Sequence, residues 1–189
     1  MENKRNKVKQ VAKALFSEKG YKKVSMDEIA KVSGVTKRTI YSYFKDKDEL
    51  FRTFIEEELL AMKDIVESIE KQDITFFEKI HTTIYQLLKY KKQNEFLNAI
   101  TLEADQLKTN SAVTYLKMVN DNIQLYIKEK LEAAIQNGYI KACDVDLSSF
   151  LIYKLYIAML FEWNNTEKEL DETQITDSIT RILKTGIFN

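Results

Sequence analysis

The sequence of 189 residues contains no proline, four glycines and single copies of cysteine, histidine and tryptophan. Without proline nothing interrupts long helices, and each glycine falls where a segment of helical periodicity ends. One cysteine excludes an internal disulfide. Because no metal-ligand cluster, phosphate-binding glycine loop or nucleophile motif appears, we expect no metal, no cofactor and no catalytic residue. An enzyme with a carboxylate-only site stays open.

Long hydrophobic runs are also missing. The most apolar stretch, residues 150–163, has 14 residues and contains Lys154 and Glu162, so it is too short and too charged to span a bilayer. The N-terminus is too charged for a signal peptide. We therefore expect a cytoplasmic protein with no membrane partner.

Helical periodicity fills most of the chain and predicts an all-α fold of about nine helices. We divide it into an N-terminal three-helix domain, residues 1–48, and a C-terminal helical domain, residues 49–189. The first helix shows one apolar stripe, which predicts that it braces the next two. Its members are Val8, Val11, Ala12, Leu15 and Phe16.

Residues 25–50, SMDEIAKVSGVTKRTIYSYFKDKDEL, carry the most information. Ser25 and Glu28 form a predicted capping box, Gly34 breaks the first helix, and Thr36 is a good N-cap for a second helix that runs from Lys37 to about residue 44. A third cap, Asp46, opens a long connecting helix. The layout is that of a helix-turn-helix DNA reader.

The formal net charge of zero conceals two opposite halves. Through Arg52 the chain holds 14 Lys and Arg against 7 Asp and Glu, and the remainder holds 15 against 22. A basic segment with a helix-turn-helix fits a phosphate binder, while an acidic remainder keeps the rest of the molecule off DNA.

Residues 8–51 resemble the N-terminal domain of the tetracycline-repressor (TetR) family of bacterial transcriptional regulators. The stretch GVTKRTIYSYFKDKDEL, preceded by FSEKGYKKVSMDEIA, carries the resemblance. Its ordered positions are Gly20, Tyr21, Ile29, Ala30, Gly34, Val35, Thr36, Ile40, Tyr41, Tyr43, Phe44, Lys45, Lys47 and Leu50. Val32 and Ser33 depart from the small residues more usual there.

DNA contacts divide into base readers and phosphate binders. Lys37 is the best base reader because its ammonium can donate to guanine O6 and N7, and Thr39 and Ser42 share its face. Arg38 suits either a base or a phosphate. Ser25 and Thr36 lie at helix N-termini, which attract anions. The resemblance implies phosphate contacts for Tyr43 and Lys47, and to a lesser degree for Tyr41.

Residues 147–163 are apolar on nearly every side of a helix, so other parts of the protein must cover this helix on two sides. A core helix of a monomer is one explanation. The resemblance implies a second subunit instead, and a two-fold dimer matches a palindromic operator in double-stranded DNA. We expect a homodimer with an interface near Phe150, Leu151, Ala158, Phe161, Ile175, Ile179 and Ile182.

The resemblance also implies a C-terminal pocket for an unidentified small molecule that lowers DNA affinity when bound. Glu103 is unusual, because it shares a helix face with apolar residues and needs a partner if buried. One hypothesis makes it a ligand contact for a cationic aromatic compound, and the other makes it a boundary residue that reaches solvent. Lys154 leaves an anionic ligand open. The predicted ligand set is Tyr85, Phe96, Glu103, Tyr115 and Trp163.

These features predict a ligand-responsive, sequence-specific transcriptional regulator, a repressor released from its operator by a small molecule. The alternatives are a non-specific DNA binder and a regulator that responds to no ligand.

Overall fold

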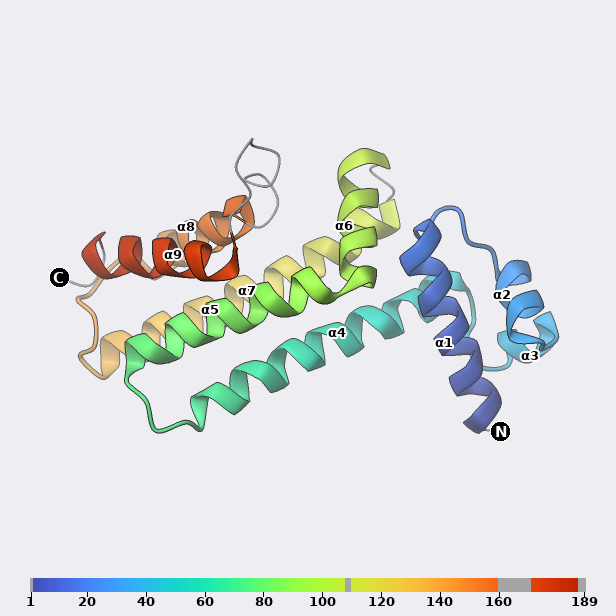
Figure 1. The fold of residues 1–189 in the computed structure, drawn as a ribbon, viewed down its shortest axis with the longest axis horizontal. Coiled ribbons are helices and arrows are strands. Elements are labelled where there is room, and N and C mark those ends of the chain that lie inside the picture. Colours follow the sequence, from blue (N-terminus) through green and yellow to red (C-terminus); the bar gives the residue numbers. More distant parts are fainter. Residues whose placement is uncertain (1, 108–109, 160–170, 187–189) are drawn as a thin grey trace. The chain divides into compact units, whose positions relative to one another are not determined.

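The computed structural model describes residues 2–107, 110–159 and 171–186, and the regular elements in these ranges are all helical (Figure 1). The described residues form nine α-helices, which confirms the predicted fold class. They are α1 Glu2–Lys19, α2 Met26–Ser33, α3 Lys37–Tyr41, α4 Lys47–Glu70, α5 Phe76–Gln93, α6 Glu95–Leu107, α7 Asn110–Gln136, α8 Val145–Ile157 and α9 Glu172–Gly186.

The chain divides into two compact units. The first unit comprises Met1–Ala61 and Lys91–Val119, and the second comprises Met62–Tyr90 and Asn120–Asn189. Their boundaries fall inside α4, α5 and α7. Residues 1–48 therefore belong to the first unit together with the first part of α4 and all of α6.

Aromatic rings form the centre of the first unit. The Phe16 ring of α1 lies edge-on to the Phe51 ring of α4, with centroids 5.4 Å apart, and 6.1 Å from the Phe54 ring. Phe96 of α6 lies 5.6 Å from Phe51 and 5.7 Å from Phe54. These tilted and edge-to-face contacts join α1, α4 and α6 into one core.

The predicted stripe of α1 lies in this core. Four of its five members, Val8, Ala12, Leu15 and Phe16, are buried, and Val11 is half-buried. α1 packs against both α2 and α6. The prediction that the first helix braces the helix-turn-helix is confirmed.

Aliphatic side chains hold the second unit together. Leu88 of α5 packs with Ile175, Ile179 and Leu183 of α9. A separate cluster contains three buried residues, Leu131, Ala134 and Ile140. The half-buried Ile152 of α8 packs against both clusters, so α8 connects them.

Candidate nucleic-acid interface

The turn between α2 and α3 is built from local hydrogen bonds. Ser25 caps α2 by accepting from the Glu28 N–H at 3.2 Å, while the Glu28 carboxylate pairs with Lys19 rather than closing the predicted capping box. Gly34 ends α2 at φ +68°, a conformation that side chains with a Cβ rarely adopt. The buried Ser33 hydroxyl donates to the Ile29 carbonyl at 2.6 Å, which satisfies it inside the helix end.

α3 is shorter than predicted. Thr36 caps it by accepting from the Thr39 N–H at 3.2 Å, as expected, but the regular helix ends at Tyr41. The chain then continues as a tight turn in which the N–H groups of Tyr43 and Phe44 both donate to the Ile40 carbonyl. The buried Ile40 anchors the segment to the core.

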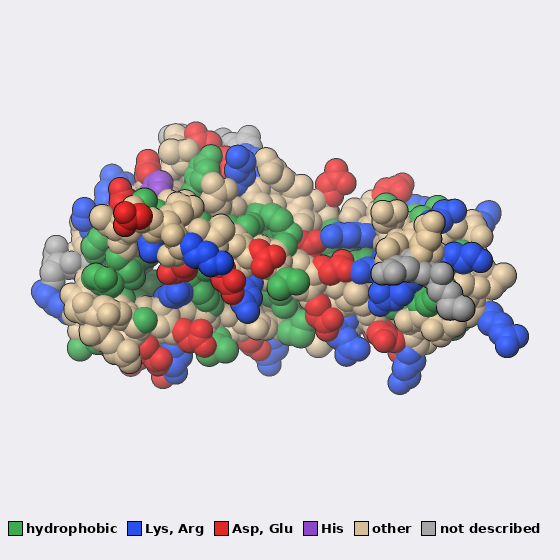
Figure 2. Space-filling model, turned by 90° about the horizontal axis from the view of Figure 1, so that it is seen from below, with side chains coloured by type: hydrophobic (Ala, Val, Ile, Leu, Met, Phe, Trp, Pro, Cys, Tyr) green, Lys and Arg blue, Asp and Glu red, His purple; other side chains and the backbone are tan. Residues whose placement is uncertain are grey.

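The outer face of α3 presents basic and aromatic groups. Lys37, Arg38 and Tyr41 are exposed, and 46% of the Tyr41 side chain is accessible. Figure 2 shows Lys and Arg side chains (blue) spread over the part of the molecule that contains α1–α3. This face has the charge and accessibility that a DNA-reading helix requires.

Lys37 is held by an acidic neighbour. Its ammonium lies 2.7 Å from the Asp27 carboxylate of α2, and both side chains are exposed. The hydrogen bond to Asp27 and its negative charge raise the pKa of Lys37. To donate to a base, Lys37 must leave this ion pair.

Three hydroxyls predicted to face DNA lie together on α3, and each already has an intramolecular contact. The Thr36 and Thr39 hydroxyl oxygens are 2.9 Å apart, and the Ser42 hydroxyl donates to the Thr39 carbonyl at 2.7 Å. Hydroxyl groups both donate and accept, so these contacts leave acceptor or donor capacity for a phosphate or base.

Lys47 points into the protein. Its ammonium donates to the Tyr21 and Val24 carbonyls, both at 2.9 Å, and lies 4.1 Å from the centroid of the Tyr21 ring. Burial lowers the pKa of Lys47, against smaller opposing effects of the Asp48 and Glu103 charges. Its phosphate contact remains a prediction, and the structure adds a second role, fixing the α1–α2 turn.

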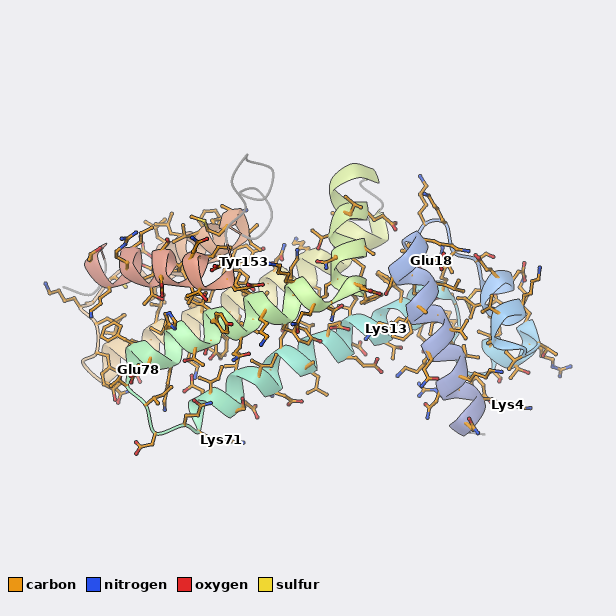
Figure 3. The ribbon with its side chains drawn as sticks, viewed as in Figure 1. Lys4, Lys13, Glu18, Lys71, Glu78 and Tyr153 are labelled. Carbon is orange, nitrogen blue, oxygen red and sulfur yellow. The ribbon has the colours of Figure 1, made fainter. Side chains whose placement is uncertain are left out.

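Tyr43 is half-buried at the end of the α3 turn. Next to it along the chain, the Phe44 ring carries the Arg5 guanidinium at 5.1 Å from its centroid. Arg5 belongs to α1, which begins at Glu2, so the basic residues near the N-terminus are helical. Lys4, labelled in Figure 3, lies in the same first turns of α1.

The predicted ligand residues come from both units. Phe96 and Glu103 lie in the first unit, where Phe96 joins the aromatic core and Glu103 accepts from the Lys22 N–H. Tyr85 is half-buried in the second unit. The structure does not describe the Tyr115 side chain, and Trp163 lies outside the described residues. A ligand site built from this set remains a prediction.

The predicted dimer-interface residues fall into two groups. Phe150, Leu151 and Ile182 are 43%, 55% and 48% exposed. Ile175 and Ile179 are buried within the aliphatic core of the second unit. Ala158 is half-buried and Phe161 lies outside the described residues.

Sequence reasoning missed two buried acids of the first unit, Glu58 and Glu103, as structural partners of the DNA-binding segment. Glu58 accepts at 2.7 Å from Lys13 of α1, a residue labelled in Figure 3. Glu103 accepts from the backbone of the α1–α2 turn. The available signal was a carboxylate on an apolar face, which indicates a buried partner but not its identity.

Neither a metal site nor a membrane span is found in the described part of the chain. There, no three His, Cys, Asp or Glu side chains are grouped in a way that could hold a metal ion. None of the described helices combines the length and hydropathy needed to cross a bilayer.

Comparisons with known proteins agree with this geometry. Residues 10–53 match the model of the bacterial regulatory proteins, tetR family. Over 172 residues the chain is 32% identical to the uncharacterized HTH-type transcriptional regulator YhgD of Bacillus subtilis, covering 91% of this chain and 90% of that protein. It is 26% identical over 197 residues to the fatty acid metabolism regulator protein of the same organism, covering both chains completely.

Solved structures have the same fold. The transcriptional regulator FadR from Bacillus subtilis, in complex with stearoyl-CoA, superposes with a TM-score of 0.77 at 22% identity. The superposition covers 96% of this chain and 98% of that one. A TetR-family regulator from Syntrophomonas wolfei gives a TM-score of 0.80 at 22% identity, covering 97% and 94%.

Proposed function

This chain belongs to the TetR family of bacterial transcriptional regulators, and from that premise we propose that it is a dimeric, ligand-responsive repressor that binds a palindromic operator. The observation that carries the DNA-binding part is the exposed face of α3, which is held by the buried Ile40 and by the N-cap at Thr36. The helix is anchored to the core while its polar residues stay accessible, which direct readout in the major groove needs.

The short length of α3 favours a dimer. α3 has only five residues, so one copy contacts few base pairs. Two copies related by a two-fold axis engage two half-sites and multiply the affinity of each. Exposed apolar side chains on α8 and α9, at Phe150, Leu151 and Ile182, support an interface there.

We infer a long-chain acyl-CoA thioester as the ligand class. The support is similarity to a fatty acid metabolism regulator along the whole chain, and a shared fold with a regulator solved with stearoyl-CoA. Half-buried apolar residues around the core of α5 and α9 offer contacts for an acyl chain. They are Ile84, Ile152, Leu155, Tyr156 and Met159.

Release requires that the ligand bind the DNA-incompetent arrangement more tightly than the competent one. About 5.5 kcal/mol of differential affinity moves a two-state equilibrium from 99:1 to 1:99. A ligand that binds both arrangements equally leaves the operator occupied, however high its affinity.

The experiment begins with selection of bound sequences from random double-stranded DNA. We expect an enriched palindrome, a dimer by sedimentation, and release on titration with stearoyl-CoA, followed by fluorescence anisotropy of labelled operator. Coenzyme A alone and stearate alone are the controls, because each carries half of the ligand.

Three results would contradict parts of the proposal. No enriched sequence, together with binding that depends only on salt, indicates a non-specific DNA binder. A monomer in sedimentation removes the two-fold operator. Operator binding unaffected by stearoyl-CoA rejects the acyl-CoA class, and titration with lipophilic cations then tests the alternative built on Glu103.

A further inference from the structure

Two acidic side chains are buried among the residues that the structure describes. One bonds to both α1 and the residue before α6, and the other joins α6 to the turn between α1 and α2. Glu58 of α4 is 2% exposed and Glu103 of α6 is 5% exposed. A buried carboxylate is costly without hydrogen-bond donors, so the partners of these two groups are structurally constrained.

Glu103 meets the turn between α1 and α2. Its two carboxylate oxygens lie 3.1 Å and 3.2 Å from the backbone nitrogen of Lys22, which donates to them. A Cβ at Gly20 would come within 2.6 Å of Oε2, the oxygen that lies 3.2 Å from the Lys22 nitrogen, and Gly20 has φ +79°. Glycine is therefore required here for its conformation and for the close approach of the carboxylate.

α4 holds the same turn through other atoms. Lys47 donates to the carbonyls of Tyr21 and Val24, and the Tyr21 hydroxyl donates to the Asp48 carboxylate at 2.6 Å. The turn at residues 20–24 is thus bonded by α4 and by α6. Because α2 and α3 follow directly, the turn sets how these two helices are attached to α4 and α6.

The start of α6 is fixed separately. Asn94 caps α6 by accepting from the Leu97 N–H at 3.0 Å, and its side-chain amide donates to Glu58 at 2.5 Å. Glu58 also accepts from Lys13 of α1. The N-terminal end of α6 is therefore tied to both α4 and α1.

We propose that Glu103 is a positioning residue for DNA binding: by accepting from the Lys22 N–H it latches α6 to the α1–α2 turn. A displacement of Glu103 by roughly 2 Å lengthens these contacts beyond hydrogen-bonding distance. The turn that leads into α2 and α3 then loses its contact with α6.

This inference rests on the proposed function, because the latch matters most when the α3 helices of two subunits must fit two half-sites at once. Losing it should reduce affinity for the full palindrome and leave affinity for a single half-site nearly unchanged. A merely destabilised protein would lose both in proportion to its unfolded fraction.

Three substitutions at Glu103 separate the effect of side-chain length from the effect of side-chain charge. Glu103→Ala removes the acceptor, and Glu103→Asp keeps the charge but withdraws the oxygens by roughly 1.5 Å, one carbon–carbon bond. Glu103→Gln retains an oxygen at full reach. The matched control is Glu95→Ala, which removes an exposed carboxylate from the same helix.

The full-length variants are titrated with three labelled duplexes: the selected palindrome, one half-site, and the palindrome with its half-sites two base pairs further apart. We expect the Ala and Asp variants to lose about tenfold in affinity for the palindrome and to discriminate poorly between spacings. Half-site affinity should stay within about twofold. The Gln and Glu95→Ala variants should resemble the wild type.

Amide exchange on the full chain provides a readout that needs no operator. The Lys22 amide should exchange faster in Glu103→Ala and Glu103→Asp than in the wild type, while exchange in α9 stays unchanged. Equal exchange at Lys22 in all proteins, or a folded Asp variant with wild-type affinity and spacing preference, overturns the latch. Failure to select any palindrome overturns the proposed function, and the exchange data then still decide about Glu103.

Discussion

The two units of this protein are stabilised differently. In the first, aromatic rings surround Phe16, and the buried carboxylates of Glu58 and Glu103 accept hydrogen bonds from side-chain and backbone donors. In the second, aliphatic clusters form the core and large apolar side chains remain on the surface of α8 and α9. Directional hydrogen bonds fix the attachment of α2 and α3 in the first unit, whereas the exposed apolar side chains of α8 and α9 are suited to association.

The largest effect is expected from removing the central ring of the first unit. Phe16→Ala should lower the free energy of unfolding by roughly 3–5 kcal/mol, because the truncated ring leaves a cavity among Phe51, Phe54 and Tyr21. Urea denaturation followed by circular dichroism measures it. Leu60→Ala, at a position 58% exposed on α4, should cost little. Similar costs for both would contradict a ring-centred core.

Association is the next largest effect and tests the surface of the second unit. Leu151→Arg should dissociate the dimer and lower operator affinity by about one hundredfold or more, at least about 2.8 kcal/mol, because two-site binding is lost. Sedimentation and anisotropy report the two changes.

Leu125→Arg is the matched control for that substitution. Leu125 on α7 is 55% exposed, the same as Leu151. A Leu151→Arg protein that remains dimeric, or a Leu125→Arg protein that dissociates, places the interface elsewhere.

A smaller effect separates base readout from phosphate contact in the first unit. Lys37→Ala should cost roughly 1–3 kcal/mol of discrimination at one base pair. Tyr43→Phe should weaken binding to every sequence by a similar factor. Competition between the operator and single-base variants measures both. Equal loss of sequence preference in the two variants would reject the assignment.

The smallest effect concerns alkaline pH and the second unit. Tyr153 is labelled in Figure 3. Burial, with a smaller effect of the Asp121 charge, raises the pKa of Tyr153 to about 12. Burial also raises the pKa values of Tyr126 and Tyr156. Between pH 10 and 12 the unfolded chain loses these protons while the folded chain keeps them, so stability should fall as pH rises.

Tyr153→Phe should make that fall less steep. Thermal unfolding across the same pH range measures it, with tyrosinate absorbance as an independent record of ionisation. Tyr139→Phe removes the hydroxyl of a tyrosine that is 55% exposed and serves as the control. An unchanged slope in Tyr153→Phe would contradict the shift.

Local sequence determined much of the first unit. The caps at Ser25 and Thr36, the left-handed Gly34 and the buried stripe of α1 are all found where the pattern predicts them. Such features depend on neighbours within one or two helical turns, so short-range pattern contains their cause. The end of α3 was predicted three residues too late, because tight turns after Tyr41 maintain a helix-like spacing.

Long-range partners could not be deduced in the same way. The spacing of Ile175, Ile179 and Ile182 predicts one apolar helix face, yet the first two are buried against Leu88 and only Ile182 is exposed. Periodicity identifies an apolar face but does not show whether its own chain or a second chain covers it.

The sequence by itself determined the all-α fold, the helix-turn-helix and the face of α3 that carries Lys37 and Arg38. Only the tertiary structure decided that Glu103 bonds to the Lys22 backbone and that Lys47 holds the same turn from α4. The reason is physical. A cap or a stripe is specified by residues a few positions apart, whereas the partner of a buried charge depends on which distant helix the folded core brings against it.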